Sequence, residues 1–340
     1  MAFKVAVVGA TGNVGREMIK VLSERSFPIS DMIALASSRS VGLKLPFGDN
    51  TIEVQDLDSY NFSGTDICLM SAGSALSTKI SHKIADTGCT VIDNSSAWRY
   101  DPEVPLIVPE VNPKAIDLCS SKNIIANPNC STIQLVVVLK PLHDYADIKR
   151  VVVSTYQSVS GAGKKGMDEL LEQTESFFDS RIKKPQIFTK NIAFNVIPHI
   201  DVFMDDNSTK EEWKVVVETK KILEQDIKIS CTAVRVPVLI GHSASVNIDF
   251  GNNITAEQAR LILNKSSGCK VIDQPKNGIY ITPAECVNED YVFISRIRKD
   301  TTLKNGLNLW IVANNLRKGA ALNAVQIAEL FTKNLIKNKK

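Results

Sequence analysis

A short apolar segment, followed at once by a glycine-rich turn and a helical pattern, opens the chain. Residues 3–8 form a continuous apolar run, and Gly9, Gly12 and Gly15 lead into helical spacing over residues 14–24. Residues without a Cβ allow a tight turn, and the N–H groups at the start of a helix bind phosphate. Glycine turns also follow strands for structural reasons alone, and the spacing here is not the common G-x-G-x-x-G. The place of this turn, at the first strand–helix junction, favours a dinucleotide site.

The rest of the first half alternates apolar segments with a helical pattern. We predict strands at residues 32–36, 67–70, 91–93 and 106–108, and a helix at residues 77–87. Apolar runs without strict alternation are typical of parallel strands that helices cover on both faces. The pattern therefore predicts a Rossmann-type, doubly wound α/β domain.

The pattern changes near residue 131. Residues 131–142 are apolar nearly all round, which predicts a deeply buried helix. We expect strands after it at 149–156, 227–239, 244–250, 291–298 and 307–313, and helices at 164–178, 210–223 and 320–336. The sequence thus predicts a dinucleotide-binding domain at residues 1–131, completed by the C-terminal helix 320–340. It also predicts an α+β catalytic and dimerisation domain at residues 132–319, with a mostly antiparallel or mixed sheet.

Charge and cysteine content argue against several classes of protein. The 340 residues include 40 Lys+Arg and 37 Asp+Glu, and a net charge of +3 does not indicate a nucleic-acid partner. No apolar run approaches the roughly 18–20 residues of a membrane span, and the first residues do not resemble a secretory signal. The seven cysteines include no C-x-x-C pair, so we expect neither a disulfide framework nor a metal site. These features predict a cytoplasmic protein.

The end of the second predicted strand bears on which dinucleotide is bound. An NAD-preferring site places Asp or Glu there to bind the ribose 2′-hydroxyl, but this segment contains Ser38 and Arg39 and no carboxylate. A guanidinium beside hydroxyl groups suits a 2′-phosphate, although a solvated surface arginine is the alternative. The segment favours NADP(H).

One cysteine has the setting of a nucleophile. Cys130 lies in Asn-Pro-Asn-Cys-Ser-Thr (residues 127–132), a turn that leads into the predicted buried helix. The N–H groups and the dipole at a helix N-terminus stabilise a thiolate and can also bind an oxyanion. The other six cysteines lie in settings typical of inert core residues. Cys130 is therefore the predicted nucleophile.

A thiol nucleophile needs a group that handles protons, and the chain has four histidines. His242 follows an apolar segment, 234–241, that contains Arg235. An arginine inside so apolar a strand is costly unless it meets an anion. We predict that Arg235 and His242 belong to the site; the alternative is a buried structural ion pair and a surface histidine. Of the remaining histidines, His82 and His143 are predicted to be structural, whereas His199 fits either a structural position or the site and is assigned no role.

Two further segments combine charge or glycine with the start of a helix. Residues 156–166 read YQSVSGAGKKG, a loop that would either hold a phosphate or cofactor group or simply cap a helix. Residues 210–214 read KEEWK, in which Glu211 and Lys214 are three apart and share a helix face. Taken alone, such a charge cluster is typical of solvated surface.

A series of segments occurs in the order found in aspartate-semialdehyde dehydrogenases: GATGNVG, SSRS, SSAWR, NPNCST, YQSVSGAG, EEWK, RVPVLIGHS and NLRKGAA. The chain resembles this family from residue 3 to about residue 331, and NPNCST and the Arg–His spacing are the specific parts. The resemblance implies NADPH-dependent reduction of L-aspartyl 4-phosphate to L-aspartate 4-semialdehyde with release of phosphate, in lysine, threonine, methionine and diaminopimelate biosynthesis. It also implies a homodimer or homotetramer built through the sheet of the second domain.

The resemblance implies roles for individual residues. The implied catalytic residues are Cys130 as the thioester-forming nucleophile, His242 as acid and base, and Gln157 as the group that orients the acyl chain. The implied substrate contacts are Arg235 with the carboxylate, Glu211 (or Glu212) with the ammonium, Arg99 and Lys214 with phosphate, and Asn129. The implied cofactor contacts are Gly9, Thr11, Gly12, Asn13, Val14, Ser38, Arg39, Ser160, Gly161 and Asn315.

The sequence leaves two other functions open. N-acetyl-glutamyl-phosphate reductase uses the same cofactor and the same Cys and His chemistry, but its acylated substrate does not need a carboxylate at Glu211. A non-catalytic NADP-binding redox sensor that uses Cys130 would not need Arg235, Glu211 and Lys214 together. Both arguments favour the aspartate enzyme.

Overall fold

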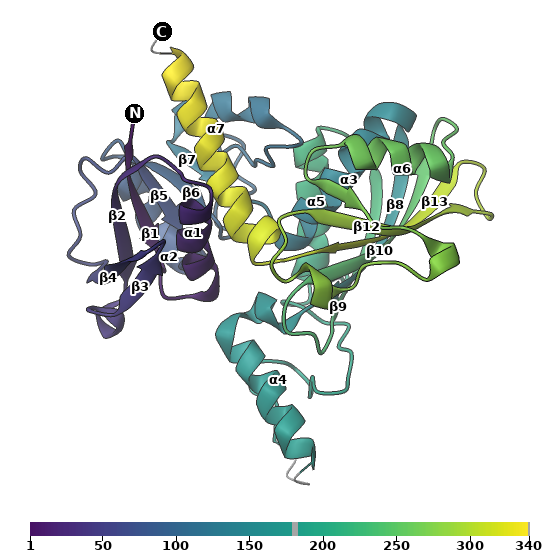
Figure 1. The fold of residues 1–340 in the computed structure, drawn as a ribbon, viewed down its shortest axis with the longest axis horizontal. Coiled ribbons are helices and arrows are strands. Elements are labelled where there is room, and N and C mark those ends of the chain that lie inside the picture. Colours follow the sequence, from purple (N-terminus) through teal and green to yellow (C-terminus); the bar gives the residue numbers. More distant parts are fainter. Residues whose placement is uncertain (179–182, 339–340) are drawn as a thin grey trace. The chain divides into compact units, whose positions relative to one another are not determined.

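The computed structural model describes residues 1–178 and 183–338 and forms two compact units (Figure 1). Unit 1 contains Met1–Asn129 and Ala320–Lys340, and unit 2 contains Cys130–Gly319. The division falls after Asn129, not after residue 131, because Cys130 already begins the first helix of unit 2. Residues 339–340 of the predicted C-terminal helix lie outside the described residues.

Unit 1 is a seven-stranded sheet with the strand order β3-β4-β2-β1-β5-β6-β7. Its strands are β1 (Phe3–Val8), β2 (Ile29–Ala36), β3 (Lys44–Phe47), β4 (Asn50–Asp56), β5 (Ile67–Met70), β6 (Thr90–Asp93) and β7 (Ile124–Ala126). Neighbouring strands are parallel except β3 with β4. β2, the next strand along the chain, pairs with one side of β1, and the later strand β5 pairs with the other side. The strand order therefore reverses at β1, where open α/β sheets bind their ligands.

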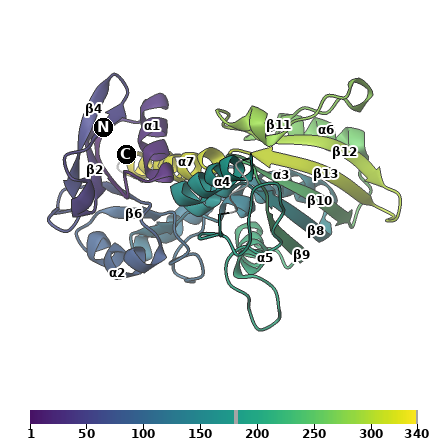
Figure 2. The same cartoon turned by 90° about the horizontal axis from the view of Figure 1, so that it is seen from below.

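Three helices pack on this sheet (Figures 1 and 2). They are α1 (Asn13–Glu24), α2 (Ser74–Ala85) and α7 (Leu322–Asn338). Met18 and Leu22 of α1 join one buried core with Val325 of α7 and with Val5 and Val7 of β1. Helix α2 packs on β6 and β7. This architecture confirms the predicted doubly wound α/β domain.

Two features near the sheet edges differ from the predictions. Residues 106–108 do not form a strand, because only Leu106 bridges to Ala126 and the edge strand is β7. Prolines flank this segment and lack the N–H group that a strand ladder requires. The β3–β4 hairpin is absent from the prediction, since its first strand has only four residues and contains Pro46.

Unit 2 is a six-stranded mixed sheet with the order β11-β12-β13-β10-β8-β9. Its strands are β8 (Ile148–Gln157), β9 (Lys228–Arg235), β10 (His242–Phe250), β11 (Cys269–Val271), β12 (Val292–Asp300) and β13 (Gly306–Ala313). β8 is parallel to β9 and β11 to β12, and the other neighbours are antiparallel. The mixed sheet confirms the predicted α+β class of the second domain.

Helices cover one face of this sheet (Figure 2). The helices of unit 2 are α3 (Cys130–Ala146), α4 (Gly163–Phe178), α5 (Lys210–Leu223) and α6 (Ala256–Lys265). Helix α3 packs against α5, α6 and the central strands, and its long apolar run is buried as predicted. Along β10, Ala244, Val246 and Ile248 are buried, whereas Ser245 is exposed on the opposite face. None of the helices in the described ranges has both the length and the hydropathy required to span a membrane.

Other parts of unit 2 depart from the prediction. The strand predicted at 227–239 is shorter, because β9 ends at Arg235 and Pro237 follows closely. A proline cannot donate to the strand ladder, so the segment leaves the sheet there. Helix α6 and strand β11 are absent from the prediction, since each is too short for its periodicity to stand out.

Candidate active site

The glycine turn joins β1 to α1 and leaves the start of the helix without a side-chain cap. Gly9 has φ +79°, and a Cβ there would lie 2.5 Å from the carbonyl oxygen of Ser71. A Cβ on Gly15 would lie 2.2 Å from the carbonyl oxygen of Gly9, so the turn and the helix meet closely only because both positions are glycine. Gly12 is the N-cap residue, and the first turn has no acidic side chain. The backbone of residues 11–14 therefore fits a phosphate group.

The candidate 2′-phosphate residues lie in a short 3₁₀ turn, Ser38–Ser40, just after β2. β1 and β2 are parallel neighbours with Val8 beside Leu35, so this turn and the glycine turn lie at the same edge of the sheet. The side chain of Arg39 is exposed, and the turn contains no acidic residue. A guanidinium in this setting fits a phosphate better than a ribose hydroxyl.

Cys130 is the first residue of α3 and is partly exposed. Gly319 packs against it, since a Cβ on Gly319 would lie 3.1 Å from the Cβ of Cys130. Arg235 is near enough to interact with the charge of Cys130: burial lowers the pKa of Arg235, and Glu211 and Cys130 oppose that lowering. A helix N-terminus and a nearby guanidinium both favour a thiolate.

Most of the other cysteines have the properties of core residues. Burial raises the pKa of Cys89, Cys119 and Cys286 to about 12. Burial also raises the pKa of Cys68 and Cys231. These thiols stay protonated at neutral pH and are poor nucleophiles. Within residues 1–178 and 183–338, no three His, Cys, Asp or Glu side chains are grouped to hold a metal ion.

Three neighbouring strands bring Gln157, Arg235 and His242 to one edge of the unit 2 sheet. Gln157 ends β8 and lies beside Arg235, the last residue of β9. β10 runs antiparallel to β8 and begins at His242, next to the pair formed by Ser243 and Tyr156. The three polar side chains are all buried. Strand register therefore unites residues that are far apart in the sequence.

The two ring nitrogens of the buried His242 have different surroundings. Nδ1 lies 3.1 Å from the backbone nitrogen of Ser158 and 3.0 Å from Ser158 Oγ. Nε2 has no hydrogen-bond partner among the described residues. Burial and the positive charge of Arg235 lower the pKa of His242 well below its usual value, so the ring is neutral at neutral pH. Nε2 is thus the ring atom that can meet a substrate.

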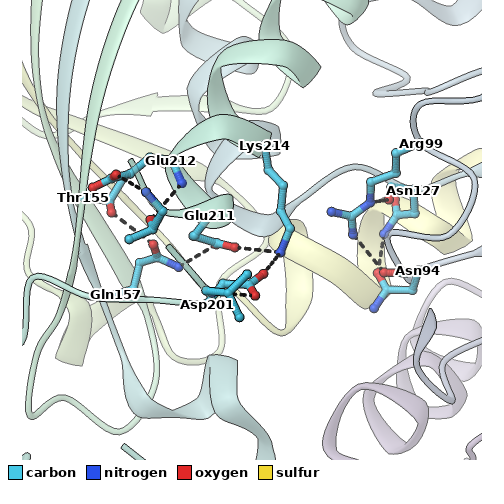
Figure 3. Close-up of polar contacts among 11 residues, drawn as sticks. Asn94, Arg99, Asn127, Thr155, Gln157, Asp201, Glu211, Glu212 and Lys214 are labelled. Carbon is cyan, nitrogen blue, oxygen red and sulfur yellow. Dashed lines mark hydrogen bonds and ion pairs between the residues drawn. The ribbon is translucent and has the colours of Figure 1, made fainter. Parts of the chain in front are cut away.

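An ionic cluster at the start of α5 adjoins Gln157 (Figure 3). The Glu211 carboxylate accepts from Gln157 Nε2 at 3.1 Å and from Lys214 Nζ at 3.2 Å. Lys214 also pairs with Asp201 Oδ2 at 2.6 Å. Thr155 Oγ1 donates to Gln157 Oε1 at 3.0 Å, which holds the Gln157 amide in one orientation. Burial opposes the charge on Lys214, but Glu211 and Asp201 outweigh it and raise the pKa of Lys214.

Glu211, and not Glu212, belongs to this cluster. The carboxylate of Glu212 accepts the backbone N–H of Thr209 at 2.7 Å and that of Ala233 at 2.9 Å. Thr209 and Glu212 form the capping box that begins α5. Both oxygens of Glu212 are therefore used by the backbone, and Glu211 is the candidate partner of a substrate ammonium.

Arg99 and Asn129 belong to unit 1. Arg99 Nε donates to the carbonyl oxygen of Asn127 and Arg99 Nη2 to that of Asn94, each at 2.9 Å (Figure 3). The side chain of Asn127 donates to Asn94 Oδ1 at 2.6 Å and so links the two residues whose backbone oxygens accept from Arg99. Arg99 is buried and firmly held, which suits recognition of an anion. Asn129 is also buried and directly precedes Cys130 in the chain.

Three of the candidate cofactor residues lie beside His242 in unit 2: Ser160, Gly161 and Asn315. Asn315 Oδ1 accepts the N–H of Gly241 at 2.9 Å, and Asn315 Nδ2 donates to Ser160 Oγ at 2.9 Å. A Cβ on Gly161 would lie 2.9 Å from Arg235 Nη1 and 3.4 Å from His242 Nε2. These residues therefore shape the surroundings of Arg235 and His242, a role that their spacing in the sequence does not indicate.

Sequence reasoning misses Thr155, Ser158 and Asp201, each of which holds a candidate site residue. Ser158 lies in the glycine-rich loop at residues 156–166, but nothing in the sequence links it to His242. Asp201 has φ +69°, which is uncommon for a residue other than glycine, and only the structure reveals this backbone conformation. His199, for which no role is predicted, stacks on Phe203 with ring centroids 4.3 Å apart. That contact gives His199 a packing role.

Two family models match the chain. Residues 4–119 match the model described as "Semialdehyde dehydrogenase, NAD binding domain". Residues 139–318 match the model described as "Semialdehyde dehydrogenase, dimerisation domain". The first match lies within unit 1 and the second within unit 2.

Individual proteins named aspartate-semialdehyde dehydrogenase match nearly the full length. The Aquifex aeolicus (strain VF5) protein is 52% identical over 336 residues, which cover 98% of this chain and 99% of the relative. The crystal structure of aspartate semialdehyde dehydrogenase II complexed with ASA from Vibrio cholerae has 46% identity and a TM-score of 0.96, covering 98% of this chain and 99% of that one. The Candida albicans enzyme with NADP has 27% identity and a TM-score of 0.75, covering 98% and 99%. The chain belongs to the aspartate-semialdehyde dehydrogenase family.

Proposed function

We propose that the protein reduces L-aspartyl 4-phosphate to L-aspartate 4-semialdehyde with NADPH, through a thioester on Cys130. The carrying observation is the buried sheet edge that joins Gln157, Arg235 and His242, with Arg235 within electrostatic range of Cys130. The Cys130 thiolate forms a bond to the acyl carbon while the bond to phosphate breaks. A thioester keeps the acyl group activated, which a free carboxylate is not. NADPH, when bound, supplies the hydride that converts the thioester to the aldehyde.

Charges on the described residues match the two ends of an amino acid. Arg235 binds the substrate α-carboxylate through its guanidinium, since a buried cation is stabilised by an anion. Glu211 binds the α-ammonium, and Gln157, which is held by Thr155, orients the acyl group. His242 Nε2 meets the reacting carbonyl oxygen.

Lys214 and Arg99 are the proposed phosphate-binding cations. Lys214 already pairs with Asp201 at 2.6 Å, so phosphate would compete with that carboxylate for the ammonium. Asn129, just before Cys130, is a further proposed substrate contact. The proposed cofactor contacts are Gly9, Thr11, Gly12, Asn13, Val14, Ser38 and Arg39 in unit 1 and Ser160, Gly161 and Asn315 in unit 2.

A steady-state assay tests the proposed reaction in its reverse direction. The purified protein should oxidise L-aspartate 4-semialdehyde in the presence of phosphate and NADP, and omission of phosphate should remove most turnover. N-acetyl-L-glutamate semialdehyde is the comparison substrate, because its amine is neutral and gives Glu211 no cation to bind. Turnover of only the acetylated compound would reject the proposal.

Replacing Arg39 with alanine should discriminate between the two cofactors. A lost charge-assisted contact to the 2′-phosphate would raise the KM for NADPH roughly ten- to a hundredfold and leave the KM for NADH nearly unchanged. Lys20→Ala, which removes an exposed cation from α1, is the control and should change neither KM. Equal losses with both cofactors would mean that Arg39 does not bind the 2′-phosphate.

We also propose that the protein is a homodimer formed through the sheet face of unit 2 that α3 does not cover. This face carries the exposed Ser245, which lies beside Trp310 in the sheet register. Trp310 contacts Tyr156 on the same face, with ring centroids 5.4 Å apart. A partly exposed aromatic pair on an uncovered sheet face suits contact with a second copy.

Ser245→Arg should therefore shift the protein from dimer to monomer. The substitution would place a large charge in the centre of the proposed contact, where it has no partner. Analytical ultracentrifugation measures the mass, with Ser59→Arg on the exposed surface of unit 1 as the control. A Ser245→Arg protein that remains as dimeric as the control would remove this face from the interface.

The cytoplasm is the proposed compartment. None of the seven cysteines, all of which lie within the described residues, forms a disulfide, and the reaction requires a reduced Cys130 and a supply of NADPH.

A further inference from the structure

The ammonium group of Lys214 lies between two carboxylates of unit 2. Lys214 Nζ is 2.6 Å from Asp201 Oδ2 and 3.2 Å from Glu211 Oε2 (Figure 3). The Lys214 side chain is 12% exposed and the Asp201 side chain 30%, so water screens these contacts only in part. Glu211 also accepts from Gln157 Nε2 at 3.1 Å and is the proposed partner of the substrate ammonium. Asp201 has no proposed substrate contact, and its carboxylate occupies a position on Lys214 that an incoming anion could take.

Backbone contacts, and not the ion pair alone, hold Asp201 in this place. Asp201 Oδ1 accepts the N–H of Val202 at 2.9 Å. The N–H of Lys210, the first residue of α5, donates to the carbonyl oxygen of Val202 at 2.8 Å. Asp201 has φ +69°, a conformation that aspartate tolerates better than most residues. Burial opposes the charge on Asp201, but the contact with Lys214 outweighs it and lowers the pKa of Asp201. The segment before α5 therefore presents an ionised carboxylate to Lys214 at neutral pH.

We propose that Asp201 is a resident counter-ion that competes with phosphate for Lys214 and so sets the affinity of the site for anions. This inference rests on the proposed function, since it takes Lys214 as a phosphate-binding cation. Lys214 is available to phosphate only in the fraction of molecules in which Asp201 has released it, and the apparent affinity is lowered by that fraction. The factor is the same for every anion that binds through Lys214, because it depends on the free protein alone.

The competition has its main consequence when phosphate leaves. In the direction of semialdehyde formation, phosphate is a product that must be released. As phosphate departs, Asp201 pairs with the Lys214 ammonium again, so the cation is not left unpaired in a largely buried position. A site without this carboxylate would bind phosphate more tightly and would be inhibited by lower concentrations of it.

Asp201→Asn tests the inference, because it removes the charge and keeps the backbone. The asparagine oxygen can still accept the N–H of Val202, and asparagine also tolerates a positive φ. In the oxidation of the semialdehyde with NADP, the KM for phosphate should fall roughly three- to tenfold, the effect of removing one partly exposed competing charge. Sulfate, a tetrahedral dianion, should compete with phosphate, and its inhibition constant should fall by the same factor. An unchanged or raised KM for phosphate, or a fall for phosphate without one for sulfate, would overturn the inference.

Asp206→Asn is the matched control. It makes the same change of charge a few residues further along the chain, where the Asp206 carboxylate accepts the N–H of Ser208 at 2.9 Å and its hydroxyl at 2.6 Å. The KM for phosphate should stay nearly unchanged in this variant. An equal fall in Asp206→Asn and Asp201→Asn would assign the effect to the overall charge of the protein and would reject the counter-ion role of Asp201.

Lys214→Met shows whether Asp201 acts through Lys214, because methionine keeps an apolar chain and lacks the ammonium. This variant should raise the KM for phosphate, and Asp201→Asn should no longer lower the KM when the two changes are combined. A similar fall with and without Lys214 would mean that Asp201 acts by another route, which would overturn the inference.

The same measurements separate the inference from the proposed function. If Lys214→Met leaves the KM for phosphate unchanged, Lys214 is not a phosphate-binding cation; that part of the proposed function is wrong, and the inference falls with it. If Lys214→Met raises the KM but Asp201→Asn does not lower it, the proposed function stands and only the role of Asp201 is rejected.

Discussion

Cys130→Ala should lower turnover by roughly 10⁵–10⁶-fold, because no thioester can form without the sulfur and nucleophile removal costs about this much in well-studied enzymes. NADP affinity should be almost unchanged, since Cys130 is not among the proposed cofactor contacts and the glycine turn and Arg39 lie in unit 1. Turnover is measured with L-aspartate 4-semialdehyde, phosphate and NADP, and affinity by fluorescence titration. Mass spectrometry after incubation with the semialdehyde and NADP, without phosphate, should find an acyl adduct on Cys130 of the wild type.

Cys231→Ala is the matched control, because Cys231 is also partly exposed and lies in unit 2. Burial raises the pKa of Cys231, so its thiol is not a competing nucleophile, and this variant should keep wild-type turnover. An adduct on Cys231, or retention of more than a trace of activity in Cys130→Ala, would remove Cys130 from the mechanism. If the wild type and Cys130→Ala both bound NADP fully and neither turned over the semialdehyde, the result would favour a redox sensor.

His242→Asn should lower kcat by roughly 10²–10⁴-fold, the range expected for a group that assists the reacting oxygen. The asparagine side chain can still accept the N–H of Ser158, so the bond between the end of β8 and the start of β10 is kept while Nε2 is lost. The loss should fall mainly on kcat, because Arg235 and Glu211 still bind the substrate. Steady-state kinetics with the semialdehyde, which give kcat and KM separately, measure how the loss is divided between the two.

His199→Asn provides the control for this variant. His199 also has a buried Nε2 without a hydrogen-bond partner among the described residues, but its ring stacks on Phe203, a residue with no proposed role in the reaction. Its replacement should cost stability more than turnover. Comparable losses of kcat in both variants would indicate that His242 acts on the fold and not on the reaction.

Local features made much of the fold and part of the site predictable. Three of the predicted features are each defined by residues that are consecutive in the sequence. They are the apolar run at Phe3–Val8, the glycine turn after it, and the cysteine at the start of an apolar helix. Hydrophobic periodicity and helix-start signals act over such short distances, so the two domains and the mixed sheet could be anticipated. The short β3–β4 hairpin was not predicted, because few residues define it.

The supporting parts of the site were not predictable, because they depend on pairings between distant segments. Gly241 and Asn315 are 74 positions apart, and Ser158 and His242 are 84 positions apart. Asp201 reaches Lys214 from a loop that has no periodicity of its own. The sequence likewise leaves open whether Glu211 or Glu212 binds the substrate ammonium. The hydrogen bond from the backbone N–H of Ala233 to Glu212 favours Glu211 and appears only in the structure.

Gly319 shows that a missing side chain can set the position of a reacting atom. At 3.1 Å, a methyl group there would crowd the Cβ of Cys130 and force one of the two backbones to yield by a few tenths of an ångström. Attack on an acyl carbon tolerates little displacement of the sulfur. Because Gly319 has a hydrogen atom where other residues have a Cβ, it leaves room for the backbone that positions the Cys130 nucleophile, although Gly319 itself has no proposed contact with the substrate.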